Sequence, residues 1–358
     1  MNQDQTKKLI MLSGGGTGGS VTPLLALVDY LKQNDSNRYS FIFVGTNFGP
    51  EKYLVENAGM PFVSLASGKW RRYFSLQNLL DIGKIIYAFF QSLYLLKKYQ
   101  PDILLSAGGF VSVPLAYAAR FWRIPVLIHQ QDVRAGLANK LMAHVASQVT
   151  VTFAQSLNDY GLKALWVGNP VNVRVEASLN LDQKYNLDLK KPLLLVLGGG
   201  TGSVFINWLI RDSLKQLLEF CQVVHITGTG KNDGVIKQTG YLTFEFINHQ
   251  ELIWFMDQAQ AVVSRCGLGA LTEISSLGKA SILIPMPNSH QEDNAAIFAA
   301  LKAAIVLNEK NLSTDIFISQ VRTLMTNEKA HNDLYASVKK IIKPANADLK
   351  KVVDKLLS

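Results

Sequence analysis

The fold class follows most directly from the segment Ser264-Arg265-Cys266-Gly267-Leu268-Gly269-Ala270-Leu271-Thr272-Glu273. An apolar run, Ala261-Val262-Val263, leads into it and predicts a buried strand. Two glycines then let the backbone approach a ligand closely, and we expect a helix to begin near Leu268. The N–H groups at that helix start suit a diphosphate, and Glu273 could accept hydrogen bonds from a ribose diol. The alternative is an ordinary tight strand–helix turn of an α/β domain.

Two further segments repeat this order of strand, glycine-rich loop and helix. One is Leu9–Leu12 followed by Ser13-Gly14-Gly15-Gly16-Thr17-Gly18-Gly19-Ser20, and the other is Leu193–Leu197 followed by Gly198-Gly199-Gly200-Thr201-Gly202-Ser203. Such loops cradle phosphates with backbone N–H groups, although the first lacks the Gly-Lys-Ser/Thr ending of a P-loop. Because one unit lies in each half of the chain, we expect two similar doubly wound domains.

Polar or glycine-rich segments follow other apolar runs in the same way. Ser106-Ala107-Gly108-Gly109-Phe110 follows the run at 103–105, and His129-Gln130-Gln131-Asp132 follows the run at 126–128. In an open parallel sheet, ligands bind beyond the carboxyl ends of the strands. Further strands are expected at these positions: 41–45, 149–152, 223–228, 244–247, 282–284 and 305–307.

The composition indicates a globular protein with a basic first half. Residues 1–170 hold 16 Lys and Arg against 9 Asp and Glu, whereas the remainder holds 20 against 18. No recognisable nucleic-acid-binding module accompanies this charge, so we expect no nucleic-acid partner. An anionic membrane surface or a diphosphate ligand explains the bias equally well. With two cysteines there is no disulfide framework, which favours a reducing compartment.

Residues 69–98 combine basic and aromatic side chains with an apolar helix. Lys69, Arg71 and Arg72 accompany Trp70, Tyr73 and Phe74, and the helix carries Phe89 and Phe90 and ends at Lys97-Lys98. Polar residues interrupt the apolar run, so it does not predict a membrane-spanning helix. We interpret it as a helix lying on a membrane surface. The alternative is a helix buried against the sheet.

With these residues in place the chain resembles the MurG family, bacterial transferases that add N-acetylglucosamine to lipid-linked N-acetylmuramoyl-pentapeptide. The resemblance covers nearly the whole chain and includes several motifs in the family's order. They are both glycine loops, 106–110, 129–132, 135–140, 167–171, 264–273, His290-Gln291 and Asn294-Ala295.

The resemblance implies an α/β protein of the GT-B fold, with two Rossmann-like doubly wound domains facing each other across a cleft. Residues 1–168 would form the acceptor- and membrane-binding domain and residues 169–340 the domain that binds the UDP-sugar. Residues 341–358 would form a C-terminal helix able to pack back on the N-terminal domain. The implied partners are UDP-N-acetylglucosamine, an undecaprenyl-diphosphate-linked muramoyl-pentapeptide and the cytoplasmic face of the cell membrane, where the protein would be peripheral.

The resemblance also implies roles for particular residues. The backbone of Ile247 should meet the uracil, Glu273 the ribose hydroxyls and Gln291 the transferred sugar. The turn formed by Leu268, Gly269, Ala270, Leu271 and Thr272 should meet the diphosphate and sugar. Thr17, Gly18 and Gly19 should lie near the acceptor diphosphate.

This chain departs from the family pattern mainly on the acceptor side and at phosphate contacts. Six positions differ from the family's usual residue. They are Ser20 in place of His, Phe110 in place of Tyr, Gln130 in place of Glu, Asp132 in place of Asn, Asn172 in place of Arg and Gly200 in place of Ser. We count Asp132, Asn172 and Gly200 as substrate-binding positions because they match the family's contacts.

The implied reaction is inverting glycosyl transfer, in which a base removes the proton of an acceptor hydroxyl. Ser20 is a poor base, so Asp132 and His129 are the catalytic candidates. The alternative is that His129 is a buried structural histidine and Asp132 a helix cap. No Asp-x-Asp pair occurs in the chain, and we expect no metal or other cofactor.

Two other side chains in the 264–273 segment have simpler interpretations. We expect Arg265 to pair with a carboxylate inside the protein rather than with phosphate, and Cys266 to be a small packed side chain. Besides lipid I glycosylation, two functions stay open: a GT-B transferase with another lipid-linked or soluble acceptor, and a non-catalytic relative that binds a UDP-sugar.

Overall fold

The computed structural model describes residues 7–66, 76–175, 179–231 and 238–358, with only the backbone described at 76–82. The chain divides into two compact units. The N-terminal unit comprises residues 1–172 together with 344–358, and the C-terminal unit comprises residues 173–343. The division after Asn172 lies slightly beyond the expected boundary at residue 168.

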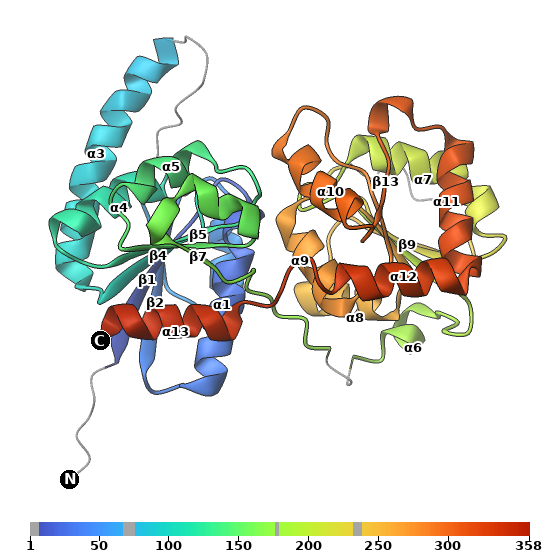
Figure 1. Ribbon diagram of the computed structural model, residues 1–358, viewed down its shortest axis with the longest axis horizontal. Helices are drawn as coiled ribbons and strands as arrows, with labels where there is room; N and C mark the ends of the chain where they lie inside the picture. The colour runs from blue at the N-terminus through green and yellow to red at the C-terminus, as the bar shows by residue number, and fades with distance from the viewer. Residues whose placement is uncertain (1–6, 67–75, 176–178, 232–237) are drawn as a thin grey trace. The chain divides into compact units, whose positions relative to one another are not determined.

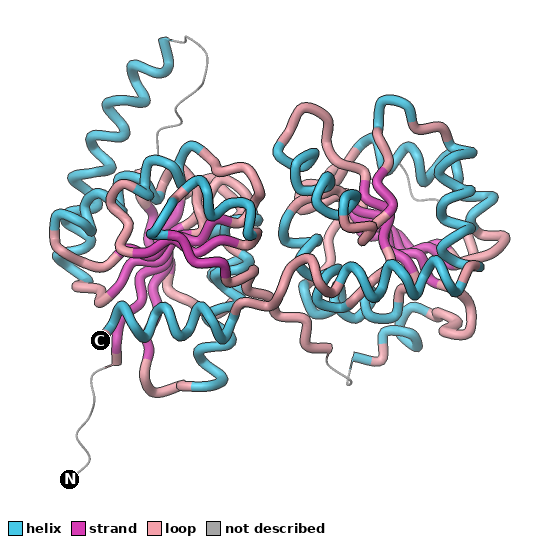
Figure 2. Tube along the Cα trace, in the orientation of Figure 1, coloured by secondary structure: helices cyan, strands magenta, loops and turns pink. Residues whose placement is uncertain are grey.

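Seven parallel strands form the sheet of the N-terminal unit, in the order β3-β2-β1-β4-β5-β6-β7. They are β1 Lys8–Ser13, β2 Tyr39–Gly45, β3 Phe62–Ser64, β4 Ile103–Ser106, β5 Val126–Gln130, β6 Gln148–Val151 and β7 Ala164–Trp166. The α-helices are α1 Thr22–Asn34, α2 Glu51–Asn57, α3 Leu76–Tyr99, α4 Ser112–Phe121, α5 Leu137–Ala143 and α13 Asn346–Leu357. They cover both faces of the sheet (Figures 1 and 2).

The C-terminal unit repeats this architecture with six parallel strands in the order β10-β9-β8-β11-β12-β13. The strands are β8 Leu193–Leu197, β9 Gln222–Ile226, β10 Tyr241–Phe244, β11 Ala261–Ser264, β12 Ser281–Leu283 and β13 Ile305–Val306. The helices are α6 Leu181–Tyr185, α7 Val204–Leu217, α8 His249–Gln258, α9 Leu268–Leu277, α10 His290–Ala300, α11 Thr314–Thr326 and α12 Glu328–Val338. The expected pair of doubly wound domains is thereby confirmed.

Three short strands differ from the sequence prediction. The strand expected at 244–247 is β10, which ends at Phe244, and Ile247 lies in the connection to α8. The edge strands β3 and β7 were not predicted, because each has only three residues and β7 leaves Leu165 and Trp166 exposed. Short, half-exposed segments lack the continuous apolar run that marks a buried parallel strand.

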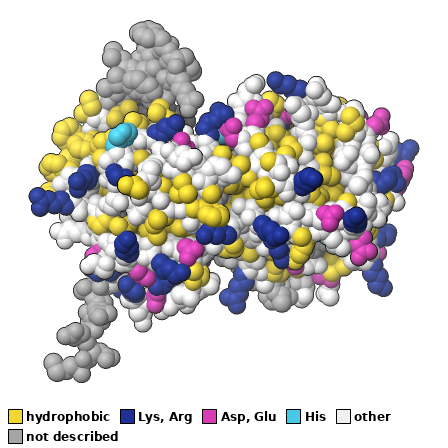
Figure 3. All heavy atoms as spheres, in the orientation of Figure 1, with side chains coloured by type: hydrophobic (Ala, Val, Ile, Leu, Met, Phe, Trp, Pro, Cys, Tyr) yellow, Lys and Arg dark blue, Asp and Glu magenta, His cyan; other side chains and the backbone are white. Residues whose placement is uncertain are grey.

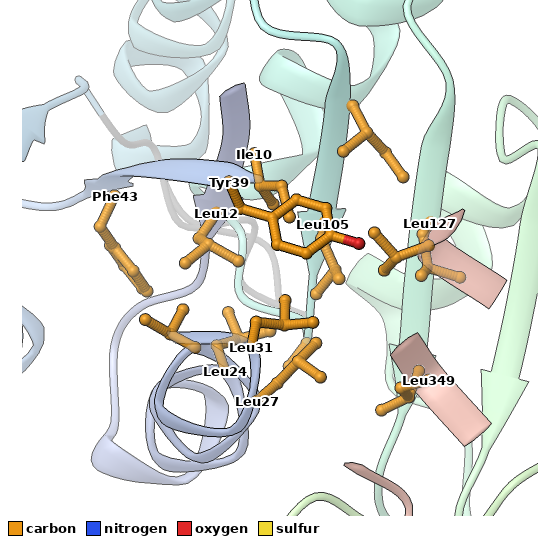
Figure 4. Close-up of a cluster of buried hydrophobic side chains, with 14 of the residues drawn as sticks. Ile10, Leu12, Leu24, Leu27, Leu31, Tyr39, Phe43, Leu105, Leu127 and Leu349 are labelled. Atoms are coloured by element: carbon orange, nitrogen blue, oxygen red, sulfur yellow. The ribbon is translucent and has the colours of Figure 1, made fainter. Parts of the chain in front are cut away.

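The last helix, α13, completes the core of the N-terminal unit. Leu349 and Val353 of α13 are buried in one cluster with Leu27 and Leu31 of α1 (Figure 4). A polar network closes over the contact: Lys350 Nζ lies 2.8 Å from both Asp35 and Asp354, and Arg38 lies 3.1 Å from Asp354.

Tyr39 joins this network through its hydroxyl, which donates to the Asp354 carboxylate. Burial, reinforced by Asp354, raises the pKa of Tyr39 to about 12, so the phenol keeps its proton. The chain therefore returns to its first domain and is fixed there by apolar burial and by hydrogen bonds.

Helix α3 has two distinct faces. Ala88, Ser92, Leu95 and Leu96 are buried, and the Ser92 hydroxyl is satisfied by the carbonyl of Ala88. The opposite face exposes large apolar side chains, which are Ile86, Tyr87, Phe90 and Tyr94. None of the helices in the described parts of the chain is long and apolar enough to span a membrane.

We predict that Leu349→Ala destabilises the protein by about 3 kcal/mol, because it opens a cavity in the core of the N-terminal unit. The change should appear as a lower midpoint of urea unfolding followed by circular dichroism. Lys351→Ala is the matched control on the exposed side of α13 and should cost less than about 0.5 kcal/mol. Equal midpoints for the two variants would contradict the assignment of α13 to this core.

Candidate functional site

In the N-terminal unit, two glycine turns meet at the carboxyl edge of the sheet. One follows β1 and the other follows β4, and these neighbouring strands lie where the strand order reverses. Gly109 has a φ of +99°, and a Cβ on it would lie 2.8 Å from the backbone N and O of Gly15. Only glycine allows this approach, so the two turns form one continuous backbone surface at the crevice where α/β sheets bind ligands.

A buried carboxylate, Glu51 at the start of α2, supports the first glycine loop. Its oxygens accept hydrogen bonds from Gly16 N at 3.4 Å, from Thr46 N at 3.0 Å and from the Thr46 hydroxyl. Because Glu51 is fully buried, these donors are what keep its polar atoms satisfied. The carboxylate thus joins the loop after β1 to the loop after β2.

The tip of the first loop is open to solvent. Thr17 and Gly19 are exposed and Gly18 is half-buried, and these residues lead through a short 3-10 helix into α1. The Ser20 hydroxyl turns inward and donates to the carbonyl of Thr17 at 3.3 Å. Ser20 therefore stabilises its own loop, whereas Thr17, Gly18 and Gly19 present the atoms that a ligand can reach.

Gln130 organises the loop that follows β5. Its amide nitrogen donates to the carbonyls of Asp132 at 2.7 Å and Arg134 at 3.3 Å. Its amide oxygen accepts from Asn139 at 2.7 Å and from the hydroxyl of Tyr160 at 2.9 Å. A glutamate at this position could not donate to two carbonyls, so glutamine suits this loop better than the residue of the family pattern.

Asp132 lies half-buried in that loop. Helix α5 begins after Gly136 and receives no side-chain cap, so Asp132 is not the cap of the helix that follows it. A carboxylate therefore stands near the carboxyl edge of the sheet, as predicted.

His129 is a structural residue. It is 1% exposed, and its ring nitrogens lie 2.7 Å from Asn169 Oδ1 and 3.0 Å from Thr150 Oγ1. Burial lowers the pKa of His129 to about 4, so the ring is neutral near pH 7. A base must reach the proton it removes. The burial and the two partners agree with the alternative of a buried structural histidine, and the catalytic role of His129 stays a prediction.

Asn172 lies at the end of the N-terminal unit. Its amide nitrogen donates to Asp29 Oδ2 of α1 at 3.3 Å. The structure therefore gives Asn172 a contact within its own unit. Its predicted contact with substrate stays a prediction.

The C-terminal unit has the same arrangement at its carboxyl edge. The loop 198–203 follows β8, and the segment 265–267 follows β11, the neighbouring strand at the reversal of strand order. Gly202 has a φ of +71°, and a Cβ on it would lie 2.1 Å from the carbonyl oxygen of Thr227. Gly200, in contrast, is exposed and faces open space.

The first turn of α9 offers uncapped N–H groups. The helix begins after Gly267 with no side-chain cap, and within the described residues the N–H groups of Leu268, Gly269 and Ala270 have no protein partner. Three parallel donors at a positive helix end are suited to an anion.

The side chains of Leu271 and Thr272 face inward, and their predicted contacts with a ligand stay a prediction. Leu271 is fully buried and its N–H donates to Gly267 O at 3.2 Å. The Thr272 hydroxyl donates to Leu268 O at 2.7 Å. Within the predicted phosphate-binding turn, the backbone N–H groups without a protein partner are thus those of residues 268–270.

Glu273 lies one turn further along α9 and is mostly buried, with 9% exposed. Its Oε1 lies 3.0 Å from His249 Nε2 at the start of α8. Ile247 lies two residues before this histidine, and its backbone N–H and carbonyl have no partner among the described residues. The residues predicted to meet the uracil and the ribose thus lie just before α8 and on the adjacent α9, and these contacts stay predictions.

Gln291 is oriented by two backbone donors. Its Oε1 accepts from Cys266 N at 3.2 Å and from Met286 N at 3.1 Å. Only the amide oxygen can accept these bonds, so the NH₂ group points away with its donors available. Asn294, one turn along α10, fixes the same segment by donating to Cys266 O at 3.1 Å.

Arg265 and Cys266 are structural, as predicted. Arg265 pairs with Glu309 at 2.5 Å and donates to Ser203 Oγ from both Nε and Nη2, at 3.1 and 2.7 Å. It thereby ties the loop after β8 to the strand ends at β11 and β13. Cys266 is buried, and burial raises the pKa of its thiol to about 12, which leaves the thiol protonated.

Glu51 and His249 were missed from sequence, and Gln130 was noted there only as part of a motif and as a departure from the family pattern. Glu51, Gln130 and His249 act through contacts with residues 35, 9 and 24 positions away respectively. Each has an ordinary local sequence. In the sequence, the signal for a site role was position alone: Gln130 is the last residue of a strand, and His249 is the first residue of a helix.

We predict that Gly200→Ser is tolerated and tightens UDP binding roughly 2- to 10-fold, because the position is open and a hydroxyl adds one phosphate hydrogen bond. Binding would be measured by isothermal titration calorimetry. Gly202→Ser is the matched control: the new Cβ would overlap backbone, and it should lose more than about 2 kcal/mol of stability. A loss of stability in Gly200→Ser would contradict the open geometry of the loop.

Comparison with known proteins agrees with the division of the chain into two domains. Residues 10–151 match the glycosyltransferase family 28 N-terminal domain, and residues 193–353 match the glycosyltransferase family 28 C-terminal domain. Among solved structures, MurG of Acinetobacter baumannii has a TM-score of 0.73 at 23% identity and covers 98% of this chain and 99% of its own. The UDP-GlcNAc 2-epimerase of Neisseria meningitidis, solved with UDP-GlcNAc, has a TM-score of 0.71 at 14% identity and covers 98% of this chain and 100% of its own. At these identities the two structures show the shared fold alone.

Two curated relatives are more similar in sequence, and both carry the name UDP-N-acetylglucosamine–N-acetylmuramyl-(pentapeptide) pyrophosphoryl-undecaprenol N-acetylglucosamine transferase. The protein of Lachnospira eligens is 39% identical over 88% of this chain and 91% of its own length. The protein of Clostridium kluyveri is 34% identical over 92% of this chain and 95% of its own length. This chain therefore belongs to glycosyltransferase family 28 and, within it, to the MurG family.

Proposed function

We propose that this protein transfers N-acetylglucosamine from UDP-N-acetylglucosamine to lipid I, the undecaprenyl-diphosphate-linked muramoyl-pentapeptide, and so makes lipid II for peptidoglycan. The observation that carries the proposal is the match to relatives of that name over about nine-tenths of the chain at 34–39% identity. The donor-site geometry supports it, because each group expected to meet the UDP-sugar reaches the carboxyl edge of one sheet.

In the C-terminal unit, four groups would hold the donor. The backbone of Ile247 would pair with the uracil, and Glu273 would accept hydrogen bonds from the ribose hydroxyls. The N–H groups at the start of α9 would bind the diphosphate and stabilise the negative charge that develops as UDP leaves. The NH₂ group of Gln291 would donate to a hydroxyl of the transferred sugar.

In the N-terminal unit, Thr17, Gly18 and Gly19 would bind the acceptor diphosphate. We propose Asp132 as the general base: its carboxylate takes the proton of the acceptor hydroxyl, the oxygen attacks carbon 1 of the sugar, and UDP leaves from the opposite face. The configuration at carbon 1 is thereby inverted. We propose that no metal ion is needed, because the helix start already supplies positive potential at the diphosphate.

We predict UDP release from UDP-N-acetylglucosamine that depends on a lipid I analogue and persists in the presence of EDTA. Asp132→Asn should lower the turnover number by roughly 10²- to 10⁴-fold, because the amide cannot accept the proton. Asp159→Asn, which removes an exposed carboxylate of the same unit, should leave turnover unchanged.

The outcomes separate the alternatives. Unchanged turnover in Asp132→Asn would remove Asp132 from the role of base. Tight binding of the UDP-sugar without analogue-dependent release would favour a different acceptor or a non-catalytic relative, and the departures at Ser20, Phe110 and Asp132 would then define the altered acceptor side.

We also propose that the protein docks peripherally on an anionic membrane through α3 and α4. The exposed apolar side chains of these helices form the patch Ile86, Tyr87, Phe90, Tyr94, Phe121 and Trp122. The Trp122 indole donates to Leu93 O at 3.3 Å, which joins the two helices. Figure 3 shows apolar side chains gathered on this part of the N-terminal unit, with basic residues among them.

Basic residues flank this patch in positions that suit anionic headgroups. Lys97 and Lys98 lie in the last turn of α3, and Arg120 lies in the last turn of α4. An apolar face with a basic rim is typical of surfaces that lie in the membrane interface. The predicted contributions of residues 69–74 lie outside the described residues. Of the two phenylalanines singled out in α3, Phe90 faces outward and Phe89 packs against the core.

We predict that Phe90→Glu weakens binding to vesicles containing phosphatidylglycerol by about tenfold or more, because it puts a charge in place of an exposed phenyl group that would enter the membrane interface. Co-sedimentation at low and high salt would measure it, and salt should weaken wild-type binding. Phe48→Glu is the matched control, since Phe48 is 99% exposed and lies outside the patch. Equal binding by both variants would defeat the membrane assignment.

A further inference from the structure

The feature that the proposed mechanism leaves unexplained is the bond between His249 and Glu273. Glu273 is mostly buried, with 11% of its side chain exposed, whereas the His249 side chain is 46% exposed. A partly exposed histidine therefore holds a carboxylate that the proposed donor site needs.

Only one oxygen of the carboxylate is occupied by this bond. Oε1 lies 3.0 Å from His249 Nε2, and Oε2 has no hydrogen-bond partner among the described residues. Because a carboxylate only accepts, the bond requires Nε2 of the histidine to carry the hydrogen. The arrangement leaves Oε2 to accept from a ligand while Oε1 is fixed.

The backbone around His249 fixes its position. It is the first residue of α8, and the N-cap residue Asn248 accepts from Glu251 N at 2.9 Å. Glu251 is a second acidic residue near the histidine, but its carboxylate is taken by Lys184 at 2.8 Å and by Tyr185 at 3.3 Å. Glu273 is thus the carboxylate with which His249 is paired.

We propose that His249 is a positioning residue for nucleotide recognition: it fixes Glu273 so that the free oxygen selects a nucleoside diphosphate with an intact ribose diol. The inference rests on the proposed function of this site. A charge-assisted hydrogen bond removes the freedom of the carboxylate before the ligand arrives, so less order has to be imposed on binding. Without it, Glu273 can turn toward solvent and the preference for the diol should fall.

The test compares binding of UDP and 2′-deoxy-UDP to the full chain by isothermal titration calorimetry. Wild type should prefer UDP by about tenfold, the contribution expected of a hydrogen bond to a charged group. In His249→Asn, whose shorter amide cannot reach Glu273, UDP affinity should fall by about tenfold and 2′-deoxy-UDP affinity should hardly change. His249→Gln places an amide donor near the position of Nε2 and should restore most of the preference.

A kinetic readout separates positioning from a general structural defect. In His249→Asn the KM for UDP-N-acetylglucosamine should rise while kcat at saturating donor is kept. Asn248→Ala is the control that loosens the start of α8 without touching the pair: it should lower the melting temperature and keep the preference for UDP over 2′-deoxy-UDP.

Two results would overturn the inference in different ways. If Glu273→Gln loses the ribose preference but His249→Asn keeps it, the donor site stands and His249 does not position it. If wild type itself binds UDP and 2′-deoxy-UDP equally, or binds neither, the proposed donor site fails and the role of His249 fails with it.

Discussion

Both units depend on a close approach of backbone to backbone at the carboxyl edge of a parallel sheet. In the N-terminal unit Gly109 meets Gly15, and in the C-terminal unit Gly202 meets Thr227 and Gly228. A side chain at either glycine would overlap main-chain atoms, which cannot move without displacing a strand. Within each unit the loops therefore pack into a surface of N–H groups and helix starts, which is suited to an anionic ligand.

Buried polar side chains stabilise these loops from the protein interior. Glu51 supports the loop after β1, and Arg265 joins the loop after β8 to Glu309. Each group makes several hydrogen bonds, which offsets the cost of burying a charge. Because these side chains face inward, the outward face keeps uncapped donors at α9 and an oriented amide at Gln291. Buried charged side chains thus fix the loops, and the neutral N–H groups that face outward are left for the proposed binding of an anionic ligand.

The departures from the family pattern form a consistent set once the contacts are known. Gln130 supplies donors that a glutamate could not, and Ser20 uses its hydroxyl to close its own loop. In the second glycine loop, the hydroxyl of Ser203 is used by Arg265 and by the start of α7, while Gly200 is left without a side chain. The proposed phosphate recognition would therefore rest on backbone groups more than on serine hydroxyls.

The sequence by itself determined the repeated unit of strand, glycine loop and helix, because continuous apolar runs ending in glycine have few other solutions in a folded chain. It also indicated polar groups in the loops and helices that follow the strands, including Asp132, Glu273 and Gln291. Tertiary structure alone decided how these groups are used. It buried His129 between Thr150 and Asn169, turned Leu271 and Thr272 inward, and paired Glu273 with His249. It also brought α13 back to the first core. These outcomes depend on contacts between residues far apart in the chain, and such contacts are fixed by packing and burial, which local sequence does not encode.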